Sequence, residues 1–416
     1  MLYVGDPQIR GLEKLAPFLE RLRLSLGVIY DPALITTTTA HSILRNYEII
    51  LPCNFSDPSE ILRTIKPVAR RLKAVLCRGS FNIACFQRII PFVPYVKTPS
   101  AESLEWAMNK ISTRQLLRAY DERLGPKSLT VTDANAETVA RVESEIGLPA
   151  IIKPAGLAES ILVQVATDRE ELDRILREMF DCLQRVYEEN HGHGEPKVLV
   201  EEFYDGKIYS IECFIDSQGA VYCCPLVREV TGREAGFPDF FIYQRIAPVQ
   251  LKPTEVKEAE TAARHAVHAL ALRSCTAHVE LIHTKQAWKI IEVNPRLGGF
   301  REDLYRDVFG FSVSENDILI RMDLIPTIRR VVRGYSLILK MYARREGRII
   351  SIRGTRLARK LPSFQKLWLR RKVGDTHLFA SHGGTNVLTV WLHHKSESVL
   401  QADVRRAEEL LQIKVE

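Results

Sequence analysis

The sequence predicts a multidomain protein of mixed α/β and α+β class, on three observations. The first 100 residues alternate short apolar runs with helical stretches, which is typical of a small α/β unit with a mostly parallel sheet. From residue 197 onward, alternating apolar runs are separated by glycine-containing turns, which indicates antiparallel hairpins. A chain of 416 residues is also long enough to divide into two or three domains.

The first expected domain covers residues 1–108. Its strands are expected in the runs MLYVG, GVIYD, YEIILPC and AVLCRG, and its helices over residues 11–24 and 58–72. The glycine-rich motifs GxGxxG and GxxxxGK[ST] occur nowhere in the chain. If the protein binds a nucleotide, other residues must therefore hold its phosphates.

The second expected domain covers residues 109–325, and the third covers residues 326–416. In the second we expect helices from residue 111, over 136–146, up to 185 and over 254–272, a strand that ends at Lys153-Pro154, and a strand in ILVQVA. Its hairpins turn at Asp205-Gly206 and at residues 216–219. The third domain is expected to be antiparallel and to end in a helix over 396–411 and a short strand.

Composition excludes several classes of protein. With 46% hydrophobic residues the chain is not disordered, and no apolar run reaches the roughly 18 residues of a membrane-spanning helix. Asp6 and Arg10 stand where an export signal would need apolar residues. The eight cysteines form no CxxC pair and lie mostly in apolar runs, which favours reduced thiols. We therefore expect a cytoplasmic protein without a membrane partner.

Positive charge is concentrated in one stretch. Residues 329–372 contain 15 Lys and Arg and one acid, Glu346, so this stretch carries +14 while the whole chain carries +7. Such a stretch could face a polyanion. Its basic residues alternate with apolar ones, however, and stacking aromatics are sparse, so we favour the outer face of a half-exposed sheet and do not expect a nucleic-acid partner.

Two acidic residues form the most informative pattern. If residues 278–283 and 288–294 are paired strands joined by a three-residue turn, Glu280 lies opposite Glu292 and His278 opposite Asn294. Side chains alternate along strands, so these four share one face, and the other face carries Val279, Leu281, Ile291 and Val293. The alternative is an exposed hairpin with solvated carboxylates.

Facing carboxylates repel each other unless they share a proton or a cation. Asn294 adds an amide oxygen, and oxygen-only sites with room for water and phosphate suit Mg²⁺. Arg296 follows on the same face and would direct its donors at an anion that the metal holds. Gly298-Gly299 permits close approach of the backbone just beyond it.

The ordered set of motifs resembles the ATP-grasp superfamily. It runs from Lys110 through Lys153-Pro154, Ser160 and Glu201-Glu202 to Glu280 and the ExNxR motif at 292–296. HVE at 278–280 and FFIYQRIAP look most like its L-amino-acid ligase (dipeptide synthetase) branch. The resemblance covers about residues 95–320 and implies an ATP-grasp fold with an N-terminal α/β pre-ATP-grasp domain and a C-terminal antiparallel lid-like domain.

The resemblance also implies roles for single residues. Lys110 and Lys153 would neutralise ATP phosphates, and Ser160 would lie in the loop that closes over them. The adenine would meet the Glu201 carboxylate and the segment Glu202, Phe203 and Tyr204. Two Mg²⁺ ions, or Mn²⁺, would be held by Glu280, Glu292 and Asn294. Catalysis would involve Arg296 and His278, and substrate contacts would come from Arg228, Arg233, Gly298 and Gly299.

Two positions depart from the family pattern. Members usually carry a second glutamate seven residues after the adenine-facing one, where it holds the ribose hydroxyls, and this chain has Ile208 there. An apolar side chain cannot accept those hydrogen bonds, so another group must bind the ribose. The loop AGLAES, which contains Ser160, is also poorer in glycine than is usual and is expected to be stiffer.

The resemblance implies an ATP-dependent carboxylate-amine ligase. ATP would phosphorylate a small carboxylic acid or amino acid, an amine would attack the acyl phosphate, and an amide, ADP and phosphate would result. A carboxylase or purine-biosynthesis enzyme of the same superfamily and a catalytically silent nucleotide-binding module are the alternatives. The expected partners are small molecules, with a possible homodimer.

Overall fold

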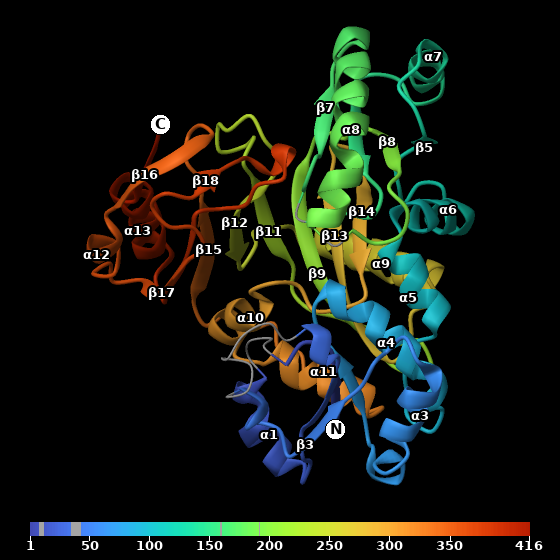
Figure 1. Ribbon diagram of the computed structural model, residues 1–416. Helices are drawn as coiled ribbons and strands as arrows, with labels where there is room; N and C mark the ends of the chain where they lie inside the picture. The colour runs from blue at the N-terminus through green and yellow to red at the C-terminus, as the bar shows by residue number, and fades with distance from the viewer. Residues whose placement is uncertain (8–11, 35–42, 159, 191) are drawn as a thin grey trace.

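The structure is a computed structural model that describes residues 1–7, 12–34, 43–158, 160–190 and 192–416. Figure 1 shows the N-terminal unit in blue, the central part in cyan to orange and the C-terminal unit in red. The N-terminal elements are β1 (Leu2–Val4), η1 (Glu13–Leu15), α1 (Ala16–Arg21), β2 (Gly27–Tyr30), η2 (Pro32–Leu34), β3 (Ile49–Pro52), α3 (Pro58–Ile65), η3 (Ala69–Arg71), β4 (Val75–Cys77), η4 (Ser80–Asn82), α4 (Ile83–Ile89) and η5 (Ile90–Phe92).

The N-terminal sheet has the order β3-β2-β1-β4, and every pair in it is parallel, which confirms the predicted parallel sheet. Both faces of β1 are buried. Leu2 packs into a core with Phe86 of α4. Tyr3 on the opposite face packs with Phe18 of α1 and with Ile318, which comes from a helix more than 300 residues further along the chain.

Two helices connect this unit to the central part, α5 (Ala101–Met108) and α6 (Lys110–Tyr120). The break between them occurs at Asn109, whose side chain accepts hydrogen bonds from the N–H groups of Ile111 and Ser112 and so caps α6. Lys110 therefore stands in the first turn of α6. One turn later, Arg114 points to the buried side of the helix.

The first central lobe is an antiparallel sheet with the order β5-β8-β6-β7, and two helices pack on it (Figure 1). Its elements are β5 (Ser128–Val131), α7 (Ala136–Glu145), β6 (Ala150–Pro154), β7 (Gln164–Ala166), α8 (Arg169–Glu189) and β8 (Val198–Glu202). The strand predicted in ILVQVA is confirmed only for its last three residues.

The second central lobe contains the largest sheet, in the order β14-β13-β9-β11-β12-β15-β19-β17, with β10 paired to β9. Its elements up to residue 325 are β9 (Lys207–Ile215), β10 (Val221–Cys223), β11 (Val227–Thr231), β12 (Ile242–Ala247), α9 (Pro253–Ala269), β13 (Cys275–His283), β14 (Trp288–Asn294), α10 (Arg301–Phe309) and α11 (Val313–Arg321). Neighbouring strands in this sheet pair antiparallel, as predicted.

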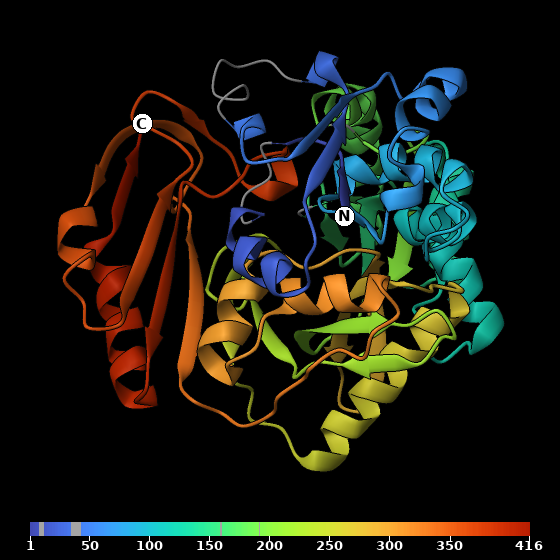
Figure 2. The same cartoon turned by 90° about the horizontal axis from the view of Figure 1, so that it is seen from below.

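Three of the six C-terminal strands continue this sheet, because β15 pairs with β12, and the other three form a separate sheet with the order β18-β16-β20. The C-terminal elements are β15 (Tyr335–Met341), β16 (Gly347–Arg353), α12 (Thr355–Ala358), β17 (Phe364–Leu369), β18 (Thr376–His377), η6 (Ala380–His382), β19 (Leu388–His394), α13 (Glu397–Leu410) and β20 (Gln412–Val415). The expected antiparallel character is confirmed. The large sheet nevertheless continues across residue 326, where we expected a domain boundary. Figure 2, which views the molecule from below, shows the C-terminal strands beside the central lobe.

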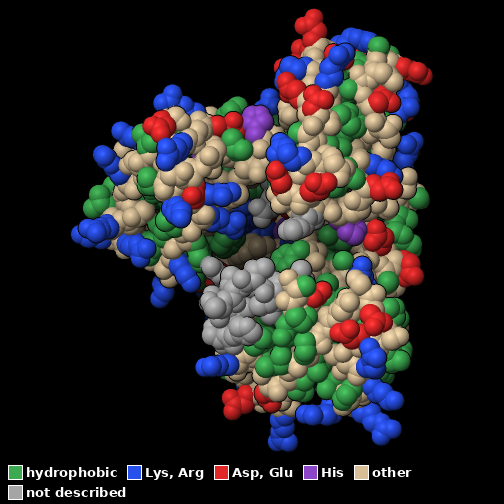
Figure 3. All heavy atoms as spheres, in the orientation of Figure 1, with side chains coloured by type: hydrophobic (Ala, Val, Ile, Leu, Met, Phe, Trp, Pro, Cys, Tyr) green, Lys and Arg blue, Asp and Glu red, His purple; other side chains and the backbone are tan. Residues whose placement is uncertain are grey.

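The basic stretch 329–372 contributes β15, β16 and β17. The middle of β15 is buried, whereas Arg348 and Arg353 of β16 and Lys366 of β17 are exposed. Lys and Arg side chains are numerous on this unit in Figure 3. The burial pattern agrees with the outer face of a half-exposed sheet. Among the described residues, none of the helices is both long enough and apolar enough to cross a bilayer.

Candidate functional site

The two acidic residues of the predicted pair do face each other. Glu280 on β13 lies directly opposite Glu292 on β14, and His278 lies opposite Asn294, which confirms the predicted register at these positions. The carboxylates remain accessible, since the side chains of Glu280 and Glu292 are 21% and 24% exposed. The interpretation as a fully solvated hairpin does not fit, because His278 and Asn294 beside them are buried.

Beyond this pair, the predicted register is wrong by one residue. A β-bulge follows Glu280, so Leu281 lies opposite Ile290. The hairpin turn accordingly covers residues 284–287 instead of 285–287, with the Thr284 N–H bonded to the Ala287 carbonyl. Ile290, and not Ile291, enters the core on the opposite face of the sheet.

Each of the two carboxylates has its own cation. Lys110 Nζ lies 3.0 Å from Glu292 Oε1, and it also donates to the Leu157 carbonyl at 2.6 Å. Burial raises the pKa of Glu292, but the charge and hydrogen bond of Lys110, together with the charge of Lys153 and a hydrogen bond from Asn294, lower it to about 2. His278 Nε2 lies 3.2 Å from Glu280 Oε1. A cationic side chain thus lies beside each of the two acids and reduces their mutual repulsion.

His278 also contacts a carboxylate on the neighbouring strand β9. Its Nδ1 lies 2.6 Å from Oε1 of Glu212, a buried residue on β9. Burial lowers the pKa of His278, but the charge and hydrogen bond of Glu212, together with the hydrogen bond to Glu280, raise it to about 9. The imidazolium form is therefore favoured at neutral pH, and it links two carboxylates. Sequence reasoning missed Glu212, although its alternation with Ser210 on β9 places it on this face.

A buried arginine neutralises two further buried carboxylates next to this site. Arg301, at the start of α10, is fully buried and contacts Glu229 of β11 and Glu212. Glu229, His278 and Glu280 approach closely enough to hold a metal ion. Arg301 and the protonated His278 already compensate these carboxylates, so we place no metal between them.

The oxygen donors that do fit Mg²⁺ are the predicted ones. Glu280, Glu292 and Asn294 lie on one face at the ends of paired strands, and both carboxylates are partly exposed. The Asn294 side chain also accepts from Arg296 Nη2 at 3.5 Å. Arg296 is anchored by a 2.7 Å hydrogen bond from Nε to the Ser80 hydroxyl of the N-terminal unit.

A second set of charges comes from the first lobe. Lys153 at the end of β6 donates a 2.6 Å hydrogen bond to Oε2 of Glu201 on β8, and both residues are buried. Burial lowers the pKa of Lys153 to about 8. Burial raises the pKa of Glu201, but the charges of Arg114 and Lys153 lower it to about 2. Sequence reasoning missed Arg114 entirely.

Glu201, which was expected at the adenine, has partners within the protein. Both of its carboxylate oxygens already accept hydrogen bonds from Arg114 and Lys153, so this side chain belongs to an internal network. The neighbouring N–H groups are also engaged, because Glu202 donates to the Lys127 carbonyl and Phe203 to the Pro149 carbonyl. Tyr204 lies beside this strand end, and its hydroxyl donates to the Glu202 carboxylate at 3.1 Å.

The loop with Ser160 lies between the first lobe and the C-terminal unit. Ser160 has a positive φ of 61°, and the Leu162 N–H donates to the Ala380 carbonyl at 3.0 Å. Glu159 of the same loop lies outside the described residues. Ile208 is on the face of β9 that carries Ser210, so the apolar position expected near the ribose does point to the site face.

Arg228 and Arg233, which were expected to contact the substrate, have partners within the protein. Arg228 is paired with Tyr209, on the opposite face of the sheet from Glu229, and it contacts Glu234. Arg233 is exposed and lies over the Phe240 ring. The structure therefore does not bring Arg228 to the carboxylate face.

The two glycines differ. The Gly298 N–H donates to Glu212, and a Cβ on Gly298 would meet His278 Nδ1 at 2.6 Å, so glycine is needed there for close packing. A Cβ on Gly299 would meet nothing within 4 Å.

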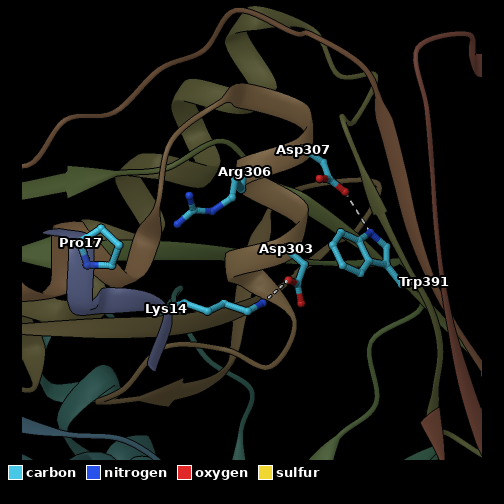
Figure 4. A pocket seen from close by; sticks show the side chains of 6 residues that line it. All are labelled: Lys14, Pro17, Asp303, Arg306, Asp307 and Trp391. Carbon is cyan, nitrogen blue, oxygen red and sulfur yellow. Dashed lines mark hydrogen bonds and ion pairs between the residues drawn. The ribbon is translucent and has the colours of Figure 1, made fainter. Parts of the chain in front are cut away.

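A separate cavity of about 380 Å³ lies between the N-terminal unit, α10 and β19. Figure 4 shows its charged groups turned toward each other: Lys14 approaches Asp303, and the Trp391 indole donates to Asp307 at 2.9 Å. These groups are already paired, so the cavity is a weaker candidate than the carboxylate face.

Residues 146–302 match the family model of the ATP-grasp domain. The uncharacterized protein y4rH of Sinorhizobium fredii is 32% identical over 205 residues, which are 48% of this chain and 38% of that protein. The chain thus spans well under two thirds of that relative.

Solved structures resemble the whole chain. The L-amino acid ligase from Bacillus licheniformis has a TM-score of 0.78 at 20% identity, with 100% of this chain and 98% of that chain covered. The N5-carboxyaminoimidazole synthase from Aspergillus clavatus, solved with ADP and 5-aminoimidazole ribonucleotide, has a TM-score of 0.69 at 14% identity, with 98% and 97% covered. At these identities the likeness concerns the fold, and it confirms the fold that the motifs implied.

Proposed function

We propose that this chain, of which residues 146–302 match the ATP-grasp domain, uses ATP and Mg²⁺ as an ADP-forming ligase. The ligase would join a small carboxylic acid or amino acid to an amine. The observation that carries the proposal is the pair Glu280 and Glu292, opposite each other on paired strands. Lys110 and Lys153 reach the same region from two other elements.

The charges suit a triphosphate. Lys110 and Lys153 come from α6 and β6, so they can neutralise phosphates from two sides as point charges. Glu280, Glu292 and Asn294 would hold Mg²⁺, which when bound neutralises charge on the phosphates during transfer. Phosphoryl transfer depends on such positioning and charge stabilisation and needs no covalent nucleophile.

Arg296 would act on the reacting groups, and His278 would support the metal-binding Glu280. The guanidinium of Arg296 is fixed by Ser80 next to Asn294, where it can stabilise the phosphoryl group and the acyl phosphate. The substrate carboxylate would displace ADP from the terminal phosphate, and the amine would then displace phosphate from the acyl carbon. His278 keeps its proton between Glu212 and Glu280 and so holds Glu280 in place.

The preference for an amino-acid acceptor rests on the likeness to the L-amino acid ligase, whose coverage is nearly complete for both chains. The likeness to the N5-carboxyaminoimidazole synthase supports the purine-type alternative, which uses the same phosphate site with another acceptor. The Ile208 position supports the third candidate, a module that binds nucleotide without turnover.

The test is a screen for ADP release with amino acids, small carboxylic acids and bicarbonate, added singly and in pairs. We expect an acid and an amine together to stimulate release, and Glu292→Ala and Arg296→Ala to abolish it. Glu258→Ala, which changes an exposed glutamate on α9, is the matched control and should keep full activity. Stimulation by bicarbonate alone would favour the carboxylase, and near-normal turnover in Glu292→Ala would refute the site.

A further inference from the structure

Arg114 lies where the two central lobes meet. It is 4% exposed and projects from α6 between β8 of the first lobe and β14 of the second. Its Nε donates to Glu201 Oε1 at 2.6 Å and its Nη2 donates to Oε2 at 3.2 Å, so the contact is bidentate. A planar fork of donors fixes the orientation of a carboxylate as well as its position.

The orientation of Glu201 in turn places Lys153. Lys153 Nζ donates to Glu201 Oε2 at 2.6 Å, and this oxygen is the one that also accepts from Arg114 Nη2. The lysine ammonium is compact and sits on a flexible stem, so its location depends on such a partner. Arg114 thus acts on Lys153 through a shared oxygen.

Arg114 makes a third contact, on the other lobe. Its Nη2 donates to the Ile291 carbonyl at 2.5 Å. Ile291 is the extra residue of β14 in the β-bulge, with no paired residue on β13, and it immediately precedes Glu292. A bulge re-aims the side chains next to it, so the hydrogen bond to this carbonyl helps to set the direction of the Glu292 carboxylate.

We propose that Arg114 is a positioning residue that holds Lys153 and Glu292 in a fixed relation across the two lobes, and so sets the affinity for the nucleotide. The inference rests on the proposed function, because it takes Lys153 and Glu292 as the groups that meet the phosphates and their metal. Arg114 itself would not contact the nucleotide.

The pKa of Lys153 depends on the charged groups around it, so each variant should change that pKa in a known direction. Burial lowers the pKa of Lys153 to about 8, Glu201 raises it, and Arg114 and Lys110 lower it. Glu292 on β14 is also within electrostatic reach of Lys153. Loss of Arg114 therefore raises the pKa of Lys153, whereas loss of the Glu201 charge lowers it.

The experiment measures MgADP binding by calorimetry between about pH 6.5 and 9.5, a range that brackets the pKa of about 8 of Lys153. In the wild type, we expect affinity to fall as pH rises past the pKa of Lys153. In Arg114→Met, affinity at neutral pH should fall about tenfold, as the loss of charge-assisted hydrogen bonds implies, and the alkaline fall should move to higher pH. In Glu201→Gln, the fall of affinity at alkaline pH should move to lower pH.

Arg118→Met is the matched control, because Arg118 lies one turn further along α6 and is exposed. It should bind MgADP like the wild type at every pH. Arg114→Lys is the second variant in case Arg114→Met does not fold: it keeps the charge and loses the fork, so we expect weaker binding with a smaller shift of the alkaline fall.

Wild-type affinity in Arg114→Lys or Arg114→Met, or shifts of the same sign in Arg114→Met and Glu201→Gln, would overturn the inference while leaving the proposed function intact. A wild-type protein that does not bind MgADP at all would overturn both. The readout is binding, so it does not depend on knowing the acid and the amine.

Discussion

Replacing Gly298 with alanine tests whether the buried pair of Glu212 and His278 is as tightly packed as the structure shows. The new Cβ would lie 2.6 Å from His278 Nδ1 and 2.8 Å from Glu212 Oε1, where ordinary contact begins at 3.4 Å. The imidazole would have to move by about 0.8 Å, from 2.6 to 3.4 Å. Its 2.6 Å hydrogen bond to Glu212 cannot survive such a shift without rearrangement of the carboxylate.

Overpacking of a core typically costs about 1–3 kcal/mol, and strain on a buried ion pair adds to it. We expect Gly298→Ala to lower the Tm by several degrees in calorimetry and to reduce ADP release, since Glu280 loses its support from His278. Gly299→Ala is the control, because its Cβ would meet nothing within 4 Å. A Gly298→Ala protein with the melting temperature and turnover of the control would refute the reasoning.

Other predictions concern buried charge and thiols. Arg301→Met should lower the free energy of unfolding by about 3–5 kcal/mol, measured by urea denaturation, because it leaves buried carboxylates unpaired. Burial lowers the pKa of His278, but Glu212 and Glu280 together raise it from 6.5 to about 9. The stabilisation by the protonated imidazole is therefore complete below pH 6.5 and is lost as pH rises through 9, so the wild type should lose more Tm over that range than His278→Gln. Cys85 and Cys182 are the partly exposed cysteines, and a thiol reagent should modify them before the buried ones, which a mass-spectrometric time course would show.

The pairing of Glu280 with Glu292 could be predicted because a hairpin register follows from the alternation of side chains. The same reasoning failed beyond Glu280, since a β-bulge is decided by packing against neighbouring strands and by the Arg114 contact with the Ile291 carbonyl. The parallel N-terminal sheet was predictable from apolar runs. The helices α10 and α11 were not predicted, because their buried faces carry polar residues such as Arg301 and Asp317, which blur the apolar period.

The partners of site residues were harder to predict than the residues themselves. Glu201 was expected at the adenine, but the sequence contains no signal that Arg114, 87 residues away, would occupy its carboxylate. Glu212 was missed because a glutamate in an apolar strand has no motif of its own, and only its contact with His278 identifies it. Long-range ion pairs of this kind depend on how sheets meet, and local patterns do not encode that.

The most direct test of the central claim is the Mg²⁺ dependence of ADP binding, measured by calorimetry with and without the metal. If Glu280 and Glu292 hold the ions that neutralise the phosphates, Mg²⁺ should strengthen binding in the wild type and in Glu258→Gln, and this gain should disappear when Glu280 and Glu292 are both changed to glutamine. An unchanged gain in the double variant would contradict the account.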